Sequence, residues 1–276
     1  MSLIIAATDF SNIGKNAVNY ACGLASAQNA QLIIVHSYLM PIMFSDVPMP
    51  ATMINDTQHD AESQMDKLVN DCSAAYPDVN MEGKVVYGDI VDVIDEYSEE
   101  HIIPQIIVVG NSSAAEINTW PDSTLYETFK KVKYPVLAVP PGATFKPVQK
   151  LCFAFDNKHA GNHNAFSKLR DITGQLNAEL HVLNIQANVP NQDNKPDFDE
   201  DAKTLLTTPN TKSHFLYETN DINLGIETFI EKNNMDILAM IPRKHTFFEG
   251  LFHKSHTKAL AHHSHIPVLA LHDDGE

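Results

Sequence analysis

The chain has 276 residues, enough for one large domain or two of ordinary size. Its hydrophobic content of 43% and charged content of 20% indicate a globular protein and exclude a disordered one. The formal net charge of −16 at pH 7 argues against nucleic acid or an anionic membrane as the main partner, because both bind basic surfaces.

The three cysteines, Cys22, Cys72 and Cys152, lie far apart and form no CxxC pair, so they predict neither a disulfide framework nor a zinc ribbon. We expect each to act as a small buried hydrophobic side chain rather than as a nucleophile or redox sensor. No apolar run approaches the ~20 residues of a membrane span, and the opening residues indicate a strand rather than a signal peptide. We therefore expect a cytoplasmic protein without a membrane partner.

The first half of the chain alternates short apolar segments with helical patterns. The predicted strands are residues 3–7, 32–36, 84–87, 106–109 and 135–139, and the predicted helices follow Ser11 and cover residues 55–75, 89–99 and 124–132. The strands show no polar alternation, so they predict a parallel sheet covered by helices on both faces. The Met- and Pro-rich residues 40–53 fit either a ligand lid or partner surface, or a loop that packs over its own domain.

A Pro- and Gly-rich segment, residues 140–147, predicts a boundary between two domains, at residues 1–142 and 148–276. After it the pattern begins again. Residues 177–180 repeat residues 29–32 at an offset of 148 positions. Such self-similarity at a near-constant offset indicates a duplication.

The offset between the two copies becomes smaller toward the end of the chain. Residues 266–271 repeat residues 134–139 at an offset of only 132 positions. This change places a deletion of 16 residues between the second and third strands of the second copy. The polar, acidic residues 191–201 lie there, and we expect them to form a mobile loop.

Both copies resemble universal stress proteins, and the resemblance covers nearly the whole chain. It is carried by Ala7-Thr-Asp-Phe-Ser11, Val35-His-Ser37, Gly88-Asp89, Gly110 and Tyr134-Pro-Val-Leu-Ala-Val-Pro140. The resemblance implies two tandem Rossmann-like or flavodoxin-like α/β domains, each a five-stranded parallel sheet with helices on both faces. It also implies that the domains pair through their last strands as an internal pseudo-dimer. A further homodimer and an unidentified protein partner stay open.

One branch of that family binds ATP through a glycine, two residues, a glycine, nine residues, and a glycine followed by serine or threonine. In the first copy the pattern begins at Gly110 and ends at Ser123-Thr124, but serine replaces two of the glycines. The added side chains stand where the family needs close approach of the backbone to phosphate, so we expect at most a weakened ATP site. The resemblance implies these candidate nucleotide-binding residues: Thr8, Asp9, Ser37, Gly110, Ser113, Ser123 and Thr124.

In the second copy all three glycines of the pattern are absent, and Pro242 follows the first position. We therefore expect the second copy to be degenerate as a nucleotide site. Its basic side chains fit either a small-anion site or ion pairs within the protein. The candidate anion-site residues are Arg243, Lys244, Lys254 and Ser255.

Histidines are frequent near the end of the chain, and His253 and His256 have the spacing of two ligands on one helix face. No further ligand has a matching spacing, so the sequence predicts no metal site. The chain also lacks the known catalytic motifs of nucleotide hydrolases, esterases and zinc proteases.

We therefore expect a stress-response regulatory or binding module that is not an enzyme. One alternative is an ATP-binding switch or slow ATPase that uses the site of the first copy. Another is a metal- or anion-binding module at the His- and Lys-rich end of the second copy.

Overall fold

The computed structural model describes residues 2–38, 51–111, 132–156, 163–186, 200–217, 222–241 and 265–272. The first half contributes β1 (Leu3–Ala7), α1 (Asn12–Gln28), β2 (Gln31–Tyr38), α2 (Ala51–Ala75), β3 (Met81–Tyr87), α3 (Ile90–Glu100), β4 (Ile106–Gly110) and β5 (Val136–Val139). The second half contributes β6 (Lys150–Asp156), α5 (His163–Leu176), β7 (Glu179–Gln186), α6 (Glu200–Leu206), β8 (Thr211–Tyr217), α7 (Ile222–Asn233), β9 (Ile237–Met240) and β10 (Val268–Ala270).

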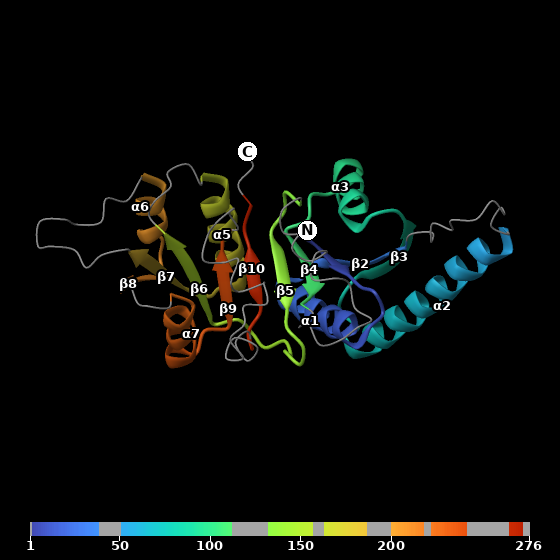
Figure 1. Cartoon of the computed structure of the whole chain (residues 1–276), viewed down its shortest axis with the longest axis horizontal. Helices are drawn as coiled ribbons and strands as arrows, with labels where there is room; N and C mark the ends of the chain where they lie inside the picture. Colours follow the sequence, from blue (N-terminus) through green and yellow to red (C-terminus); the bar gives the residue numbers. More distant parts are fainter. Residues whose placement is uncertain are drawn as a thin grey trace, which may run out of the picture.

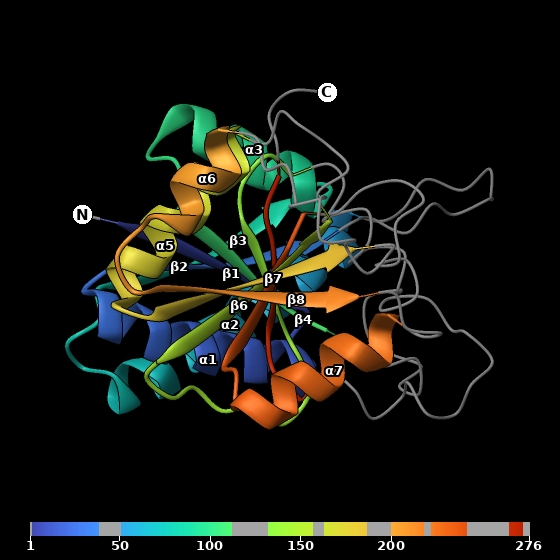
Figure 2. The same ribbon diagram turned by 90° about the vertical axis from the view of Figure 1, so that its left-hand side faces the viewer.

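The described strands form one sheet in the order β3-β2-β1-β4-β5-β10-β9-β6-β7-β8. Each half is a parallel unit with the same internal order, and the two units meet in the middle of the molecule (Figure 1). Viewed along the sheet, the strands fan out with the twist expected of a long open sheet (Figure 2). The predicted α/β fold and its duplication are thus confirmed.

The two halves join through an antiparallel pairing of β5 and β10, in which Val136 lies opposite Ala270 and Ala138 opposite Val268. This is the predicted pairing of last strands. Its consequence is one continuous sheet, whereas the sequence suggested two separate sheets, one in each half. The reason is that the apolar edge of β5 would otherwise leave its N–H and C=O groups unpaired. We call this β5–β10 junction the seam.

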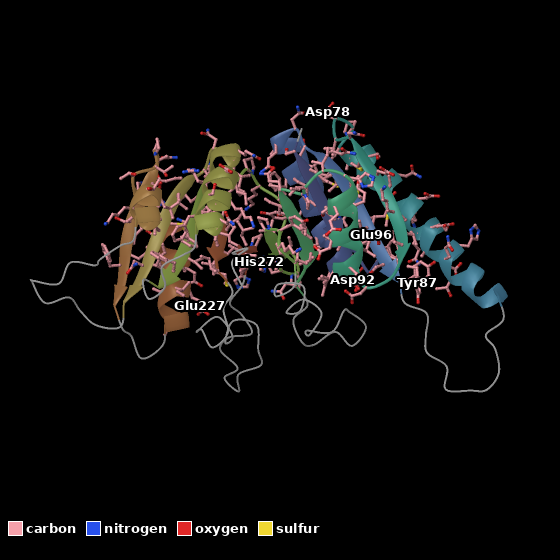
Figure 3. The ribbon with its side chains drawn as sticks, turned by 90° about the horizontal axis from the view of Figure 1, so that it is seen from above. Asp78, Tyr87, Asp92, Glu96, Glu227 and His272 are labelled. Carbon is pink, nitrogen blue, oxygen red and sulfur yellow. The ribbon has the colours of Figure 1, made fainter. Side chains whose placement is uncertain are left out.

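Side-chain hydrogen bonds and apolar packing add contacts across the seam. Lys168 of α5 donates from Nζ to the carbonyl oxygens of Lys133 (3.0 Å) and His272 (3.3 Å). The Nδ1 of His272 lies 3.0 Å from the carbonyl oxygen of Tyr134, and Figure 3 shows His272 between the two halves. On the α1 and α5 face, one hydrophobic cluster continues across the seam.

The central strands are apolar along their whole length because both of their faces are covered. Every residue of β1 is buried, as are all residues of β4 except Gly110. Helices α1 and α2 of the first half pack on one face of the sheet, and α3 packs on the other. This layering leaves the carboxyl ends of the strands as the edge where side chains of several strands meet.

Some boundaries differ from the predicted ones. Helix α2 begins at Ala51 and β3 at Met81, each a few residues before the predicted start. Residues 200 and 201, predicted as loop, form the first turn of α6. Within the described residues this helix has 7 residues, whereas its counterpart α2 has 25. Most of the predicted helix 124–132 and residues 40–50 lie outside the described residues.

In the part of the chain that the structure describes, every helix is either too short or too polar to cross a membrane.

Candidate functional site

The candidate site of the first half lies at the carboxyl ends of three neighbouring strands, β2, β1 and β4. The chain leaves β1 toward β2 on one side, and β4 lies on the other side, so the strand order reverses here. Open α/β sheets bind their ligands at such a reversal point. Thr8 and Asp9 directly follow β1, Ser37 lies near the end of β2, and Gly110 ends β4.

Asp9 organises the start of α1. Its Oδ1 accepts hydrogen bonds from the backbone N–H of Ser11 (3.0 Å) and from the Ser11 hydroxyl (2.5 Å). Ser11 is the N-cap of α1, and its Oγ in turn accepts from the backbone N–H of Gly14 (3.0 Å). Since N-cap bonds satisfy the free donors of the first turn, Asp9 has a structural role whether or not a ligand binds.

The turn between β1 and α1 is unusually tight. Phe10 has a φ of 60°, in the left-handed region that few non-glycine residues adopt. The hydroxyl of Thr8, which is buried, accepts from the N–H of Phe10 at 3.1 Å and so holds this turn. A Cβ on Gly14 would lie 2.5 Å from Asp9 Oδ1 and 2.8 Å from Thr8 Oγ1, so only glycine lets the helix begin this close to both side chains.

His36, which the sequence analysis did not single out, also belongs to this site. Its Nδ1 lies 2.8 Å from the carbonyl oxygen of Thr8, and its ring packs on Phe10 with centroids 4.3 Å apart. A carbonyl oxygen can only accept, so Nδ1 carries the proton and Nε2 of the neutral ring is an acceptor. The sequence signal for His36 was its place in Val35-His-Ser37, one of the segments that carry the family resemblance.

Gly110 is close to α1 as well. A Cβ at this position would lie 2.7 Å from Ile13 Cγ2 and 3.1 Å from the carbonyl oxygen of Ile13. Gly110 is therefore required for packing of the first turn of α1 against β4, in addition to any role toward a ligand. The contact brings Gly110 and the Asp9–Ser11 cap to the same end of α1, where N–H groups and the helix dipole favour an anion.

Ser37 is half-buried and lies in β2 opposite Val86 of β3. The next residue, Tyr38, packs edge-on against Tyr87 with ring centroids 5.8 Å apart. Tyr87 is 55% exposed and lies toward the far end of the first half in Figure 3. Ser37 thus lies at the same edge of the sheet as Asp9, next to an aromatic pair of which Tyr87 is exposed.

A family model of the Universal stress protein family matches residues 1–140 and again residues 147–272. The chain belongs to the universal stress protein family. It contains two copies of the family's domain, whereas the exact boundaries at residues 142 and 148 stay a prediction. No curated protein has a significant match to the sequence.

Solved structures agree with this fold over the full length. A universal stress protein from Archaeoglobus fulgidus has a TM-score of 0.71 at 14% identity, with 98% of each chain covered. A universal stress protein of Pseudomonas aeruginosa has a TM-score of 0.55 at 12% identity, covering 99% of this chain and 94% of the other. The cytoplasmic domain of a prokaryotic cation chloride cotransporter has a TM-score of 0.56 at 11% identity, covering 100% and 96%. These likenesses show the fold alone.

In the second half of this universal stress protein, apolar side chains occupy the equivalent of the candidate site. Phe155 takes the place of Thr8 at the end of the first strand, and it is buried. Its ring packs against Phe153 (5.6 Å between centroids) and edge-on against Phe166 of α5 (5.9 Å). These aromatic rings fit the prediction that the second copy has lost the family's nucleotide site.

Asn184 takes the place of His36 and lies opposite Phe155 in the register of β6 and β7. It is 1% exposed, and within the part of the chain that the structure describes neither its Oδ1 nor its Nδ2 has a hydrogen-bond partner. Buried amides are almost always hydrogen-bonded in native proteins, so an unpaired one requires a water, a ligand or a cost in stability.

The remaining predicted site residues lie outside the described residues. They are Ser113, Ser123 and Thr124 of the first half, and Arg243, Lys244, Lys254, Ser255, His253 and His256 of the second half. Among the residues that are described, no group of three or more His, Cys, Asp or Glu side chains could hold a metal ion.

Proposed function

We propose that this universal stress protein is a non-enzymatic regulatory module of the cytoplasmic stress response whose first half binds a nucleotide weakly. The proposed ligand is ATP, as the resemblance to the family's ATP-binding branch implies. The observation that carries the proposal is the Asp9–Ser11 cap at the start of α1, whose first turn contacts Gly110 through Ile13 at the point where the strand order reverses.

The proposed contacts are those that the resemblance to the family implies. The backbone at Gly110 and the residues Ser113, Ser123 and Thr124 would face the phosphates, while Thr8, Asp9 and Ser37 would lie toward the base and ribose. A serine in place of glycine keeps its N–H donor but adds a Cβ and a hydroxyl, which keep the backbone farther from phosphate. Weak rather than tight binding is the expected result.

Calorimetric titration with ATP and Mg²⁺ tests the proposal. We expect a dissociation constant between micromolar and millimolar for the wild type, and at least tenfold tighter binding for the double variant Ser113→Gly/Ser123→Gly. Asp9→Ala should abolish the heat of ATP binding. The equivalent change in the second half, Asp156→Ala, should leave this heat unchanged. No heat at millimolar nucleotide with either the wild type or the double glycine variant would refute a nucleotide site.

A phosphate-release assay on the same samples separates a binding module from a switch that hydrolyses ATP slowly. The described part of the site holds one carboxylate, Asp9, whose Oδ1 accepts two hydrogen bonds from Ser11. We therefore expect binding without turnover above the background rate. Release that depends on Asp9 would favour the slow ATPase instead.

A second candidate is a small-anion site in the second half, formed by Arg243, Lys244, Lys254 and Ser255. The unpaired Asn184 supports it, because this buried amide lies at the same edge of the sheet and has both a donor and an acceptor to offer. Inorganic phosphate should then raise the melting temperature of the wild type but not that of the double variant Arg243→Ala/Lys244→Ala. Equal shifts in the two proteins would exclude this site.

A further inference from the structure

Two of the three cysteines, which are 50 positions apart in sequence, meet in the core of the first half. Cys22 lies on α1 and Cys72 near the end of α2, and their exposures are 0% and 2%. Both belong to one hydrophobic cluster, and the two thiols lie close enough to shift each other's pKa. The thiol of Cys72 also donates to Oδ1 of Asn19, one turn before Cys22 on α1, with a sulfur–oxygen distance of 3.9 Å.

Cys72 thus lies against the part of α1 that carries Asn19 and Cys22. The interaction with Cys22 lowers the pKa of the Cys72 thiol, whereas the interaction with Cys72 and burial raise the pKa of Cys22. The directions of the two shifts point to Cys72 as the thiol that loses its proton first.

The third cysteine, Cys152, lies in a different cluster, and its pKa is shifted in the opposite direction from that of Cys72. Cys152 lies in β6 of the second half and belongs to a separate hydrophobic cluster under α7. Burial raises its pKa to about 12, so it stays a thiol at neutral pH. Cys152 thus serves as an internal reference for an unreactive buried cysteine.

We propose that Cys22 and Cys72 are a site of reversible oxidation, at which a peroxide converts the two thiols into a disulfide that joins α1 to α2. The thiolate of Cys72 attacks one oxygen of hydrogen peroxide and breaks the O–O bond, which gives a sulfenic acid and, after protonation, one water. The sulfur of Cys22 then attacks the sulfenic sulfur, and the hydroxyl leaves with the thiol proton as a second water. Two thiols are oxidised and one peroxide is reduced to two waters.

The location of the pair determines what the disulfide does. The inward side chains of α2 recur at helical spacing, at Ala61, Met65, Leu68 and Cys72, and Cys72 is the last of them. A bond at this point fixes the end of α2 to the middle of α1 and closes a long loop of the chain. Because both thiols are buried, the reaction depends on local opening of α2 and is slower than that of an exposed cysteine.

The test treats the native protein with hydrogen peroxide, blocks the remaining thiols in denaturant and maps the disulfides by mass spectrometry. Trypsin cleaves after Lys15, Lys67 and Lys84, which places Cys22 and Cys72 on peptides 16–67 and 68–84. We expect these two peptides to appear joined, with two hydrogen atoms fewer than their sum, while free thiols fall from three to one per chain. Dithiothreitol should restore all three, and the oxidised protein should melt about 5–10 °C higher.

Matched variants separate the pair from unspecific oxidation. Cys152→Ala should form the same disulfide at an unchanged rate, whereas Cys72→Ala should lose it and show no oxidation of Cys22. In Cys22→Ala the sulfenic acid of Cys72 should persist long enough to be trapped with dimedone. The inference is overturned if wild-type protein keeps three free thiols, if Cys152 reacts as fast as Cys72, or if the disulfides form only between chains. The wild-type map decides these outcomes even if a variant folds poorly.

Discussion

The ring of Phe145 lies directly over Gly23 of α1: a Cβ on Gly23 would be 2.5 Å from Cδ1 and 2.6 Å from Cγ of that ring. Phe145 belongs to the segment that connects the two halves, and it also packs edge-on against Tyr20, with ring centroids 5.3 Å apart. Asn16, on the same helix, donates from its amide to two carbonyl oxygens of the connecting segment. Helix α1 therefore holds the connection in place by packing and by hydrogen bonds.

Adding a methyl group at this contact should destabilise the protein. We expect Gly23→Ala to lower the free energy of unfolding by about 1–3 kcal/mol, because the new Cβ overlaps the Phe145 ring and the connection must shift. In Phe145→Ala the ring is absent, so adding Gly23→Ala to that variant should cost nothing or even stabilise the helix. A double-mutant cycle by urea denaturation measures this coupling.

Helix α5 offers the matched control at Gly174, where a Cβ would meet no atom within 4 Å. Gly174→Ala should be neutral or stabilise by up to about 1 kcal/mol, since alanine favours the helix. If Gly23→Ala and Gly174→Ala had the same effect, the close contact at Phe145 would not be responsible for the loss.

The unpaired amide of Asn184 should cost stability when no ligand is bound. We expect Asn184→Leu, whose side-chain heavy atoms have the same branched arrangement, to raise the free energy of unfolding by about 1–2 kcal/mol by removing two buried polar atoms without partners. Chemical denaturation of the two proteins in the absence of phosphate measures the difference. Asn184→Asp is the control of the same shape, and it should lower stability because it buries a charge. A destabilising Asn184→Leu would indicate that the amide is satisfied by water.

The sequence predicted features that follow from repeated or periodic apolar residues. It missed features that depend on which side chains of two different helices or strands meet. The repeat of residues 134–139 at 266–271 predicted two apolar strands, and the resemblance to the family implied that they pair with each other, as they do at the seam. Nothing in spacing placed Cys22 against Cys72, since helical periodicity gives the buried face of each helix but not which side chains meet. Helix α6 was missed because its seven residues begin with Glu200 and Asp201 and are too few to show a periodic apolar face.

A second cluster of titratable side chains lies on β7 and β8 beneath α7. Nδ1 of His181 lies 3.0 Å from Nε2 of His214, and Nε2 of His181 contacts Oε1 of Glu179. Lys212 bonds both oxygens of Glu179, each at 2.9 Å, and Phe229 of α7 packs on the ring of His214. If Nε2–H of His181 donates to the carboxylate, its Nδ1 can accept from Nε2–H of His214.

This cluster should make stability depend on pH. Burial, followed by the positive charges of His181 and Lys212, lowers the pKa of His214 in the folded protein. As pH falls below about 6.5, the unfolded chain takes up this proton before the folded protein does, so stability decreases until the lowered pKa is passed. The pKa of Glu179 is also lowered, by its bonds to Lys212 and His181, but its contribution is lost only below about pH 4.5.

Urea denaturation at pH 7.5 and pH 5.5 checks the prediction. Because other histidines contribute to the wild-type profile, the informative quantity is the difference between variants. His214→Phe should lose less stability than the wild type between these pH values, and the exposed His265→Gln should follow the wild type. If His214→Phe followed the wild type, the histidine pair would not be linked to folding.

The seam predicts that the first half cannot remain a monomer on its own. All residues of β5 are buried, and β10 satisfies one edge of that strand. A fragment of residues 1–147 exposes this apolar edge, and a second copy can pair with it in the antiparallel manner of β10. We expect a dimer at micromolar concentration by sedimentation, and a monomer for the same fragment with Leu137→Asp, because a charge at the seam opposes pairing. A folded monomeric wild-type fragment would show instead that contacts beyond β5 and β10 hold the halves together.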